Sequence, residues 1–284
     1  MGLGVSLGEG GTPLLAATRL SERLGCEVWL KWEGANPTGS FKDRGMAVAV
    51  SRALERGAPG VVCASTGNTA ASAAAYAARA GLPAVILLPA GAVARGKLAQ
   101  VHVAGAELRE VEGSFSDAHL QARQFADEEG WVNVNSINPD RIEGQSSAAR
   151  EIVEQFGGVP DVLALPYGGG GNTCAYVRGF DEAGAGRPRM LAVQSGQRAD
   201  TLASAIRIVD PVHREQAEAV AEVVTVTDDE IVEWWPAIAR LEGLFCEPAS
   251  AAAVAGVAQA RPGGRVVCVL TGHGLKDPDA VERL

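Results

Sequence analysis

Short apolar runs alternate with longer amphipathic stretches along most of this chain. The helix-like stretches span residues 69–80, 94–104, 114–129 and 141–156, and another begins at residue 172. Apolar runs bounded by polar or turn residues are typical of buried strands, and here they span residues 61–65, 84–89, 107–111, 131–136, 161–167 and 265–271. Strands that alternate with helices predict an α/β fold, in which helices cover both faces of a mostly parallel sheet.

Sheets of this kind bind ligands beyond the carboxyl ends of their strands, where loops lead into helices. Three of the predicted strands end in polar or glycine-rich loops, after Ala64, after Tyr167 and after Leu270. We expect the chemistry to lie at these loops. The 284 residues allow one large domain or two smaller domains with a shared cleft.

Composition excludes several classes of function. The net charge is −9 with scattered lysines and arginines, so we expect no nucleic-acid partner. The apolar run at 84–88 is far too short to span a bilayer, and no signal peptide opens the chain, so we expect no membrane association. The five cysteines form no CxxC pair, and Cys63 and Cys268 lie in strand-like runs, which predicts buried reduced thiols and a cytoplasmic protein. We predict no metal site.

Four consecutive glycines follow the strand-like run that ends at Tyr167. Gly168, Gly169, Gly170 and Gly171 precede Asn172, where a helix is expected to begin. Such a loop can turn its N–H groups toward an anion at the positive end of a helix dipole, so it predicts a phosphate site. The loop lacks the lysine of a P-loop and the spacing of a dinucleotide fingerprint. A flexible surface loop is the alternative, and the position directly after a buried strand makes it the weaker one.

Two other segments carry candidate chemistry. Lys42 lies in the turn-rich stretch 36–45, where a helix is expected to begin. A lysine is usually solvated, but a partly buried one can act as a nucleophile. Residues 65–69, Ser-Thr-Gly-Asn-Thr, follow a strand and open a helix, which suits a bound carboxylate. Ordinary N-capping is the alternative, although it would use only one of these residues.

The last strand ends at Thr271, which is followed by Gly272 and His273. We interpret His273 as a satisfied core histidine. Residues 247–250 predict the start of a helix, where Glu247 complements the helix dipole.

Taken together, these motifs resemble those of the threonine synthases, which are tryptophan-synthase-β-like (fold type II) pyridoxal-phosphate enzymes. The most particular matches are Asn-Ser-Ile-Asn-Pro at 135–139, with Arg141 and Gly144-Gln145, and the segment 270–278. The matching segments run nearly end to end: 8–14, 36–46, 65–82, 96–100, 135–145, 201–208, 242–256 and 266–278.

The resemblance implies a fold of two open, twisted, mostly parallel sheets flanked by helices, with the active site in the cleft between domains. The larger, cofactor-binding domain would comprise residues 1–38 and 138–284, and the smaller domain residues 39–137. We also expect a homodimer.

The resemblance also implies a role for each candidate residue toward pyridoxal 5′-phosphate and the substrate O-phospho-L-homoserine. Lys42 would hold the cofactor as a Schiff base and move protons. Thr271 would meet the pyridine nitrogen as a neutral hydroxyl, which does not enforce a protonated ring. The remaining roles are the cofactor 3′-oxygen for Asn68; the cofactor phosphate for Gly168, Gly169, Gly170, Gly171 and Asn172; the substrate carboxylate for Ser65, Thr66 and Thr69; and the substrate phosphate for Lys97, Asn135, Ser136 and Arg141.

The implied enzyme is a lyase of threonine biosynthesis that converts O-phospho-L-homoserine and water into L-threonine and phosphate by γ-elimination and β-addition. A serine or threonine dehydratase of the same fold is the first alternative, although it has no use for a second phosphate pocket. A catalytically silent, cofactor-binding regulatory protein is the second. Gly169 stands where the family usually has asparagine, and the segment at 194–203 looks short, so a specialised paralogue that takes another phosphorylated or phosphonate substrate is a third.

Overall fold

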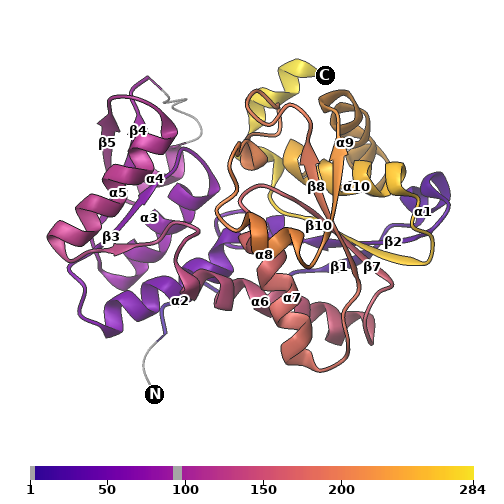
Figure 1. Cartoon of the computed structure of the whole chain (residues 1–284), viewed down its shortest axis with the longest axis horizontal. Coiled ribbons are helices and arrows are strands. Elements are labelled where there is room, and N and C mark those ends of the chain that lie inside the picture. The colour runs from indigo at the N-terminus through magenta and orange to yellow at the C-terminus, as the bar shows by residue number, and fades with distance from the viewer. Residues whose placement is uncertain (1–3, 92–97) are drawn as a thin grey trace. The chain divides into compact units, whose positions relative to one another are not determined.

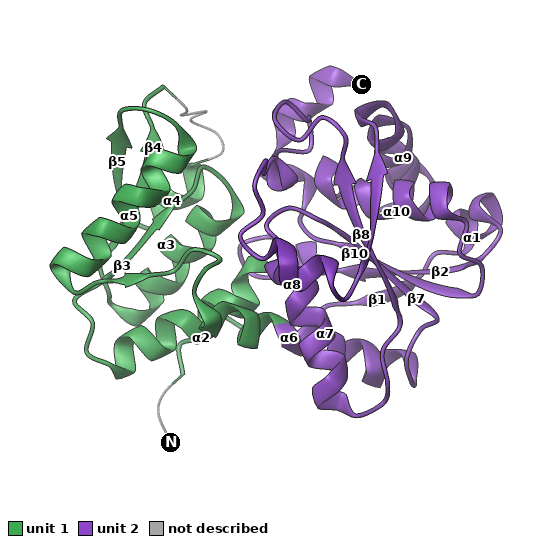
Figure 2. Cartoon of the chain, viewed as in Figure 1, with its two compact units in different colours: residues 1–9, 42–145 green, residues 10–41, 146–284 purple. Residues whose placement is uncertain are grey.

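A computed structural model describes residues 4–91 and 98–284 of the chain (Figure 1). The described residues form two compact units, each built around one sheet (Figure 2). Unit 1 comprises Met1–Glu9 and Lys42–Gln145, and unit 2 comprises Gly10–Phe41 and Ser146–Leu284.

The sheet of unit 1 has four strands in the order β5-β4-β3-β6, and every neighbouring pair is parallel. Its helices are α2 (Lys42–Glu55), α3 (Asn68–Ala80), α4 (Ala99–Val103) and α5 (Phe115–Glu129). The strands are β3 (Val61–Ala64), β4 (Ala84–Pro89), β5 (Glu107–Val111) and β6 (Val132–Asn133).

Side chains of β3 and β4 point alternately to the two faces of this sheet, and both faces are buried by packed helices. Val62 and Leu87 pack with the small residues of α5, whereas Val61 and Ile86 pack with α2 and α3. The chain enters α5 through a capping box, in which Ser114 accepts from the N–H of Asp117 and the Asp117 carboxylate accepts from the N–H of Ser114.

The sheet of unit 2 has six strands in the order β1-β2-β10-β7-β8-β9. Only the pair of β1 and β2 is antiparallel, and the other four pairs are parallel. The strands are β1 (Leu14–Ala16), β2 (Glu27–Trp32), β7 (Val162–Pro166), β8 (Arg189–Ser195), β9 (Glu222–Val226) and β10 (Arg265–Leu270).

Helices cover both faces of this sheet as well. Side chains of α9 and α10 pack on one face, and side chains of α6 and α7 pack on the other. The α-helices of the unit are α1 (Thr18–Leu24), α6 (Pro139–Phe156, whose first residues belong to unit 1), α7 (Gly171–Ala183), α8 (Arg214–Glu218), α9 (Asp228–Glu242) and α10 (Pro248–Ala260). The 3-10 helices are η1 (Glu33–Ala35), η2 (Ser204–Ile206), η3 (Gly274–Lys276) and η4 (Pro278–Arg283).

The structure confirms the predicted α/β class with two helix-flanked, mostly parallel sheets. The predicted strand at 131–136 is shorter, because Asn135 leaves the sheet to bond to Ala64. The predicted helix at 94–104 begins at Ala99 within the described residues. The unit boundaries fall at 9/10, 41/42 and 145/146, whereas the sequence placed the smaller domain at 39–137. The assignment of the larger domain to cofactor binding stays a prediction.

In the part of the chain that the structure describes, no helix is long and apolar enough to cross a membrane. Cys63 and Cys268 are buried free thiols, as predicted. Within residues 4–91 and 98–284, no group of three or more acidic, histidine or cysteine side chains has a geometry that could hold a metal ion.

Candidate functional site

Lys42 is the first residue of α2, and the chain fixes its backbone from both sides. The N–H of Phe41 donates to the backbone oxygen of Thr271 at 3.0 Å, so the peptide before Lys42 is tied to the end of β10. After Lys42, the fully buried carboxylate of Asp43 accepts a 2.6 Å hydrogen bond from Ser72 on α3. Lys42 itself is half-buried. A lysine in this setting has the partial burial that a nucleophilic amine requires.

The loop between β3 and α3 presents the N-terminus of a helix whose N-cap residue makes no side-chain cap. Gly67 occupies the N-cap position and offers no side chain, and Ser65 Oγ instead accepts from the N–H of Gly67 at 3.2 Å. Ser65 and Asn68 are buried, while Thr66 and Thr69 are half-buried. Ordinary side-chain N-capping therefore does not account for this run of polar residues. Its helical N–H groups remain suited to a carboxylate.

Asn135 fixes the end of β3 that leads into this loop. Its Oδ1 accepts from the N–H of Ala64 and its Nδ2 donates to the oxygen of Ala64, each at 2.9 Å. The side chain thereby continues the sheet where β6 has ended, and it orients Ser65, the next residue. Ser136 follows and is half-buried. The family resemblance implies a role for Asn135 at the substrate phosphate, and no local pattern in the sequence indicates this anchoring bond.

Arg141 on α6 is a buried cation, with only 1% of its surface exposed. Its Nη1 donates to the backbone oxygen of Val134 at 3.2 Å. Nε and Nη2 are buried, and neither finds a hydrogen-bond partner among the described residues. Burial lowers the pKa of Arg141 to about 10, so the guanidinium is still charged at neutral pH. Burial raises the pKa of the nearby Cys63 to about 12, so that thiol is neutral and does not offset the charge of Arg141.

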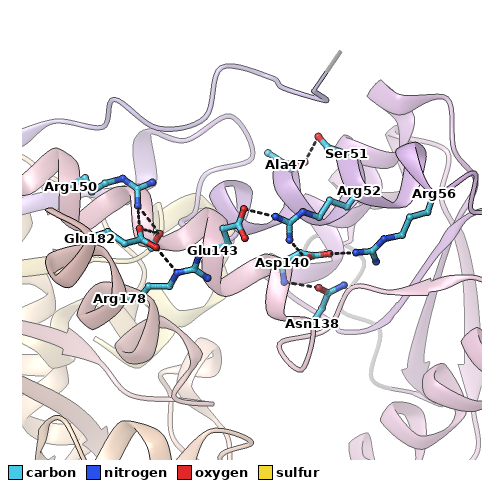
Figure 3. A network of polar contacts seen from close by, with 11 residues as sticks. Ala47, Ser51, Arg52, Arg56, Asn138, Asp140, Glu143, Arg150, Arg178 and Glu182 are labelled. Atoms are coloured by element: carbon cyan, nitrogen blue, oxygen red, sulfur yellow. Dashed lines mark hydrogen bonds and ion pairs between the residues drawn. The ribbon is translucent and has the colours of Figure 1, made fainter. Parts of the chain in front are cut away.

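Ion pairs hold the first turns of α6 against α2 (Figure 3). Arg52 pairs with Asp140, and with Glu143 at 2.6 Å. Hydrogen bonds to Glu143 and Asp140 raise the pKa of Arg52. The close approach of α2 to α6 also needs a glycine at Gly45, where an added Cβ would lie 2.7 Å from the backbone oxygen of Arg141. Arg141 is therefore held by a packed framework within unit 1.

The glycine loop of unit 2 joins β7 to α7, as predicted. Gly170 is the N-cap of α7 and adopts a left-handed conformation at φ 85°. The N–H of His213 donates to the oxygen of Gly169 at 3.0 Å, and an added Cβ on Gly170 would lie 2.9 Å from the oxygen of His213. Only glycine fits here, for both conformational and steric reasons.

Two polar side chains at the start of α7 have unsatisfied atoms. Thr173 is 1% exposed, and its Oγ1 has no hydrogen-bond partner within the described parts of the chain. The Nδ2 atom of Asn172 is likewise buried without a partner there. Buried polar groups are normally hydrogen-bonded, so these atoms suit an additional acceptor. Together with the N–H groups of the helix N-terminus, they fit a phosphate group.

Thr271 lies at the end of β10 and is buried, with 4% exposed. Its Oγ1 donates to Oε1 of Glu247 at 3.1 Å and lies 3.2 Å from Oγ of Ser250. Sequence reasoning treated Glu247 only as a complement to the dipole of α10. Glu247 is the N-cap residue, but its side chain makes no capping bond. The contact links residues 24 positions apart, which no local pattern could indicate.

The candidate residues divide between the two units. Unit 1 holds Lys42, Ser65, Thr66, Asn68, Thr69, Asn135, Ser136 and Arg141, whereas unit 2 holds the glycine loop with Asn172, and Thr271. Lys97 lies outside the described residues.

His273, which the sequence predicts to be a core histidine, is half-buried, and its Nδ1 accepts from the N–H of Leu275 at 3.1 Å.

Comparison with known proteins identifies close relatives of the whole chain. The threonine synthase of Mycobacterium leprae is 48% identical over 97% of this chain and 84% of that protein. The threonine synthase of a Synechocystis species is 48% identical over 97% of this chain and 79% of that protein. The threonine synthase of Methanocaldococcus jannaschii is 45% identical over 98% of this chain and 78% of that protein.

Solved structures share the fold at lower identity. Maize serine racemase superposes with a TM-score of 0.84 and 22% identity, covering 96% of this chain and 91% of that chain. A threonine deaminase of Solanum lycopersicum gives a TM-score of 0.83 and 23% identity, covering 95% of this chain and 82% of that chain. The family model described as pyridoxal-phosphate dependent enzyme matches residues 5–272. This chain therefore belongs to the pyridoxal-phosphate dependent enzymes, with the fold type II architecture and sequence relatives among the threonine synthases.

Proposed function

We propose that this enzyme is a threonine synthase, which converts O-phospho-L-homoserine and water into L-threonine and inorganic phosphate. The proposal is supported by identities of 45–48% to threonine synthases across nearly the whole chain. The observation that carries the choice of a phosphorylated substrate is Arg141, a buried cation with two unsatisfied nitrogens among the described residues. A buried charge of this kind is stabilised by an anion.

The glycine loop, Asn172 and the helix N-terminus of α7 fit the phosphate of the cofactor, and Thr173 adds one unsatisfied hydroxyl. Thr271 is assigned to the ring nitrogen and Asn68 to the 3′-oxygen. When bound, pyridoxal phosphate supplies an electron sink for negative charge that develops next to the substrate amino group. The cofactor phosphate and the substrate phosphate thus have separate binding groups in this account.

Lys42 would hold the cofactor covalently and then act as the acid and base of the reaction. Its amine would take a proton from Cα of the substrate and later one from Cβ. It would return one proton to Cγ once the phosphate has left, and one to Cα before threonine leaves. This work requires an amine that is neutral for part of the cycle, which the half-buried position favours.

Ser65, Thr66 and Thr69 would bind the substrate carboxylate at the N-terminus of α3, where the helix dipole favours an anion. Asn135 supports this site, because it fixes the backbone of Ala64 immediately before it.

Arg141 would bind the substrate phosphate, with Ser136, Asn135 and Lys97 as its expected neighbours. The planar guanidinium can donate two parallel N–H bonds to phosphate oxygens, which orients Cγ for loss of the phosphate. The same cation would stabilise the charge that builds on the leaving group, after which water adds at Cβ.

The alternatives use fewer of these residues. A serine or threonine dehydratase would need Lys42 and the glycine loop but has no use for Arg141. A silent regulatory protein would need no proton-transferring Lys42. A paralogue acting on another phosphorylated or phosphonate amino acid would keep Lys42, the glycine loop and Arg141. We further propose that the protein is cytoplasmic, as its cysteine pattern indicates, and that it is a homodimer, as the sequence resemblance implies.

The direct test is to incubate the cofactor-loaded protein with O-phospho-L-homoserine and to measure threonine and phosphate together. The proposal requires the two products in equal amounts, and it requires the Lys42→Ala variant to form neither. Release of phosphate with 2-oxobutyrate and ammonia, and without threonine, would show that the protein catalyses elimination but not synthesis, and would refute the proposal.

A further inference from the structure

The segment of residues 201–206 lies against the glycine loop of unit 2, and we call it the supporting segment. An added Cβ on Gly168 would lie 3.3 Å from Cα of Ile206 and 3.4 Å from the backbone oxygen of Ala205. The contact is therefore made by backbone atoms, and no flexible side chain stands between the two to absorb a shift. The position of Gly168 thus depends on how firmly the supporting segment is held.

Asp228, the first residue of α9, holds the start of this segment. Its Oδ1 accepts from Oγ1 of Thr201 at 2.6 Å, and its Oδ2 accepts from the N–H of Leu202 at 2.7 Å. Oδ1 also accepts from Oγ of Ser195, at the end of β8, at 2.8 Å. Thr201 is 0% exposed and Ser195 1%, so water has little access to their hydroxyls. One carboxylate thus joins the supporting segment to β8 and to α9.

Further bonds carry this anchoring to the residues that touch Gly168. Oγ1 of Thr201 accepts from the N–H of Ala203 at 3.2 Å, and the backbone oxygen of Ala203 accepts from the N–H of Ile206 at 2.9 Å. In the middle of the segment, Oγ of Ser204 donates to Oδ2 of Asp277 at 2.6 Å. A displacement of Thr201 would therefore pass along the segment to Ile206.

The helix that carries Asp228 does not use this carboxylate as its cap. Thr227 is the N-cap residue of α9, and it forms a capping box with Glu230. The carboxylate of Asp228 bonds to the supporting segment instead. Its removal should therefore loosen that segment without uncapping α9.

We infer that Asp228 is a positioning residue for the phosphate of the cofactor. Through Thr201 and Leu202 it holds the backbone of residues 205 and 206 against Gly168, and this contact keeps the glycine loop in the shape that binds a phosphate. The inference rests on the proposed function, which assigns the loop to the phosphate of pyridoxal phosphate. A loop that is already fixed in its binding shape loses less conformational entropy when the ligand binds, so its affinity is higher.

The test compares pyridoxal phosphate with pyridoxal, which has the same ring and aldehyde but no phosphate. The dissociation constants of both ligands are measured on the full-length apoprotein by equilibrium dialysis. Wild type should bind pyridoxal phosphate far more tightly than pyridoxal. Asp228→Ala leaves buried donors without an acceptor, so it should raise the dissociation constant of pyridoxal phosphate on the order of tenfold and change that of pyridoxal little.

The contrary results separate the inference from the assignment on which it rests. Equal weakening of both ligands in Asp228→Ala, or no weakening of either, would overturn the role of Asp228 at the phosphate. A wild type that binds the two ligands equally well would instead refute the assignment of the glycine loop to the cofactor phosphate.

Further variants trace the effect from Asp228 to the loop. Asp229→Ala removes the neighbouring, exposed carboxylate and should keep the wild-type preference for the phosphorylated ligand. Thr201→Val should reproduce the loss, whereas Thr201→Ser keeps the hydroxyl and should retain the preference. Gly168→Ala should weaken pyridoxal phosphate less in the Asp228→Ala background than in wild type, because the loosened segment can move away from the added Cβ. Strictly additive effects of these two changes would contradict a pathway through Gly168.

Discussion

The glycine loop of unit 2 and Arg141 of unit 1 are both suited to an anion, but they use different chemistry. The loop offers backbone N–H groups and the partial charge of a helix N-terminus, and it carries no formal charge. Arg141 offers a full positive charge, buried in a framework of ion pairs and close helix contacts. The first feature depends on the absence of side chains, and the second depends on one side chain.

This difference suits the two phosphates that the proposed reaction involves. A rigid backbone cradle can retain one phosphate through every turnover, because its geometry does not change with the reaction. A buried cation binds more strongly as negative charge grows on a departing phosphate, which favours the transition state. We therefore assign the loop to the cofactor and Arg141 to the substrate.

Replacement of Lys42 by alanine should have the largest effect on activity. Loss of the acid and base of the reaction should lower kcat by roughly 10²–10⁴-fold or more. The absorbance of covalently held cofactor should disappear, while the glycine loop still binds free pyridoxal phosphate. Absorbance spectra and equilibrium dialysis measure the two effects. Lys276→Ala is the matched control, because this lysine bonds to the backbone of Thr38 and should leave the spectrum unchanged.

Replacement of Gly170 by alanine should weaken the cofactor side of the comparison. The residue has φ 85°, and its added Cβ would lie 2.9 Å from the oxygen of His213. Strain of about 1–3 kcal/mol should raise the dissociation constant of pyridoxal phosphate by roughly 5- to 150-fold. Gly184→Ala, at the other end of α7, has similar backbone strain at φ 65° but no atom within 4 Å. Equal losses of cofactor affinity in the two variants would argue against a cradle at Gly170.

Replacement of Arg141 by alanine should weaken the substrate side. Loss of a charge-assisted contact costs roughly 1.5–3 kcal/mol, so kcat/KM for O-phospho-L-homoserine should fall about ten- to a hundredfold. The cofactor spectrum and affinity should change little. Arg150→Ala removes a more exposed arginine of the same helix and should spare kcat/KM. Loss of the cofactor with unchanged substrate affinity would mean that the two anion sites have been exchanged.

Replacement of Arg52 by alanine should have the smallest effect. This residue supports α6 through Asp140 and Glu143, and its side chain is 34% exposed. Partly exposed ion pairs contribute roughly 0.2–1 kcal/mol each to the free energy of unfolding. Thermal unfolding should therefore occur a few degrees lower, while kcat/KM changes less than it does in Arg141→Ala. A loss of turnover as large as that of Arg141→Ala would assign Arg52 to the site itself.

Local patterns predicted the elements that carry the site. Apolar runs located β3, β7 and β10, and the glycines located the loop after β7, because both signals lie within a few consecutive residues. The strand pattern overestimated β6, because the bond between Asn135 and Ala64 ends it early. The distant partners of Thr271 could not be predicted, since Glu247 and Ser250 lie more than twenty positions away.

The pattern of the sequence also does not mark the boundaries between the two units. Helix α6 is continuous in sequence and in structure, yet the boundary between the units falls within it, between Gln145 and Ser146. The burial of Arg141 likewise depends on the fold, which brings Cys63 and Val134 close to it. The resemblance predicts this residue, and the structure adds its burial and the two nitrogens that lack a partner among the described residues.

A second bound phosphate distinguishes the proposed threonine synthase from a dehydratase, and the substrate preference of the enzyme tests for it. Wild type should be assayed with O-phospho-L-homoserine and, separately, for deamination of L-serine and L-threonine, in the presence and absence of inorganic phosphate. We expect a far higher kcat/KM for the phosphorylated substrate and competitive inhibition of that reaction by phosphate. Faster deamination of serine or threonine, with no effect of phosphate, would contradict it and favour a dehydratase.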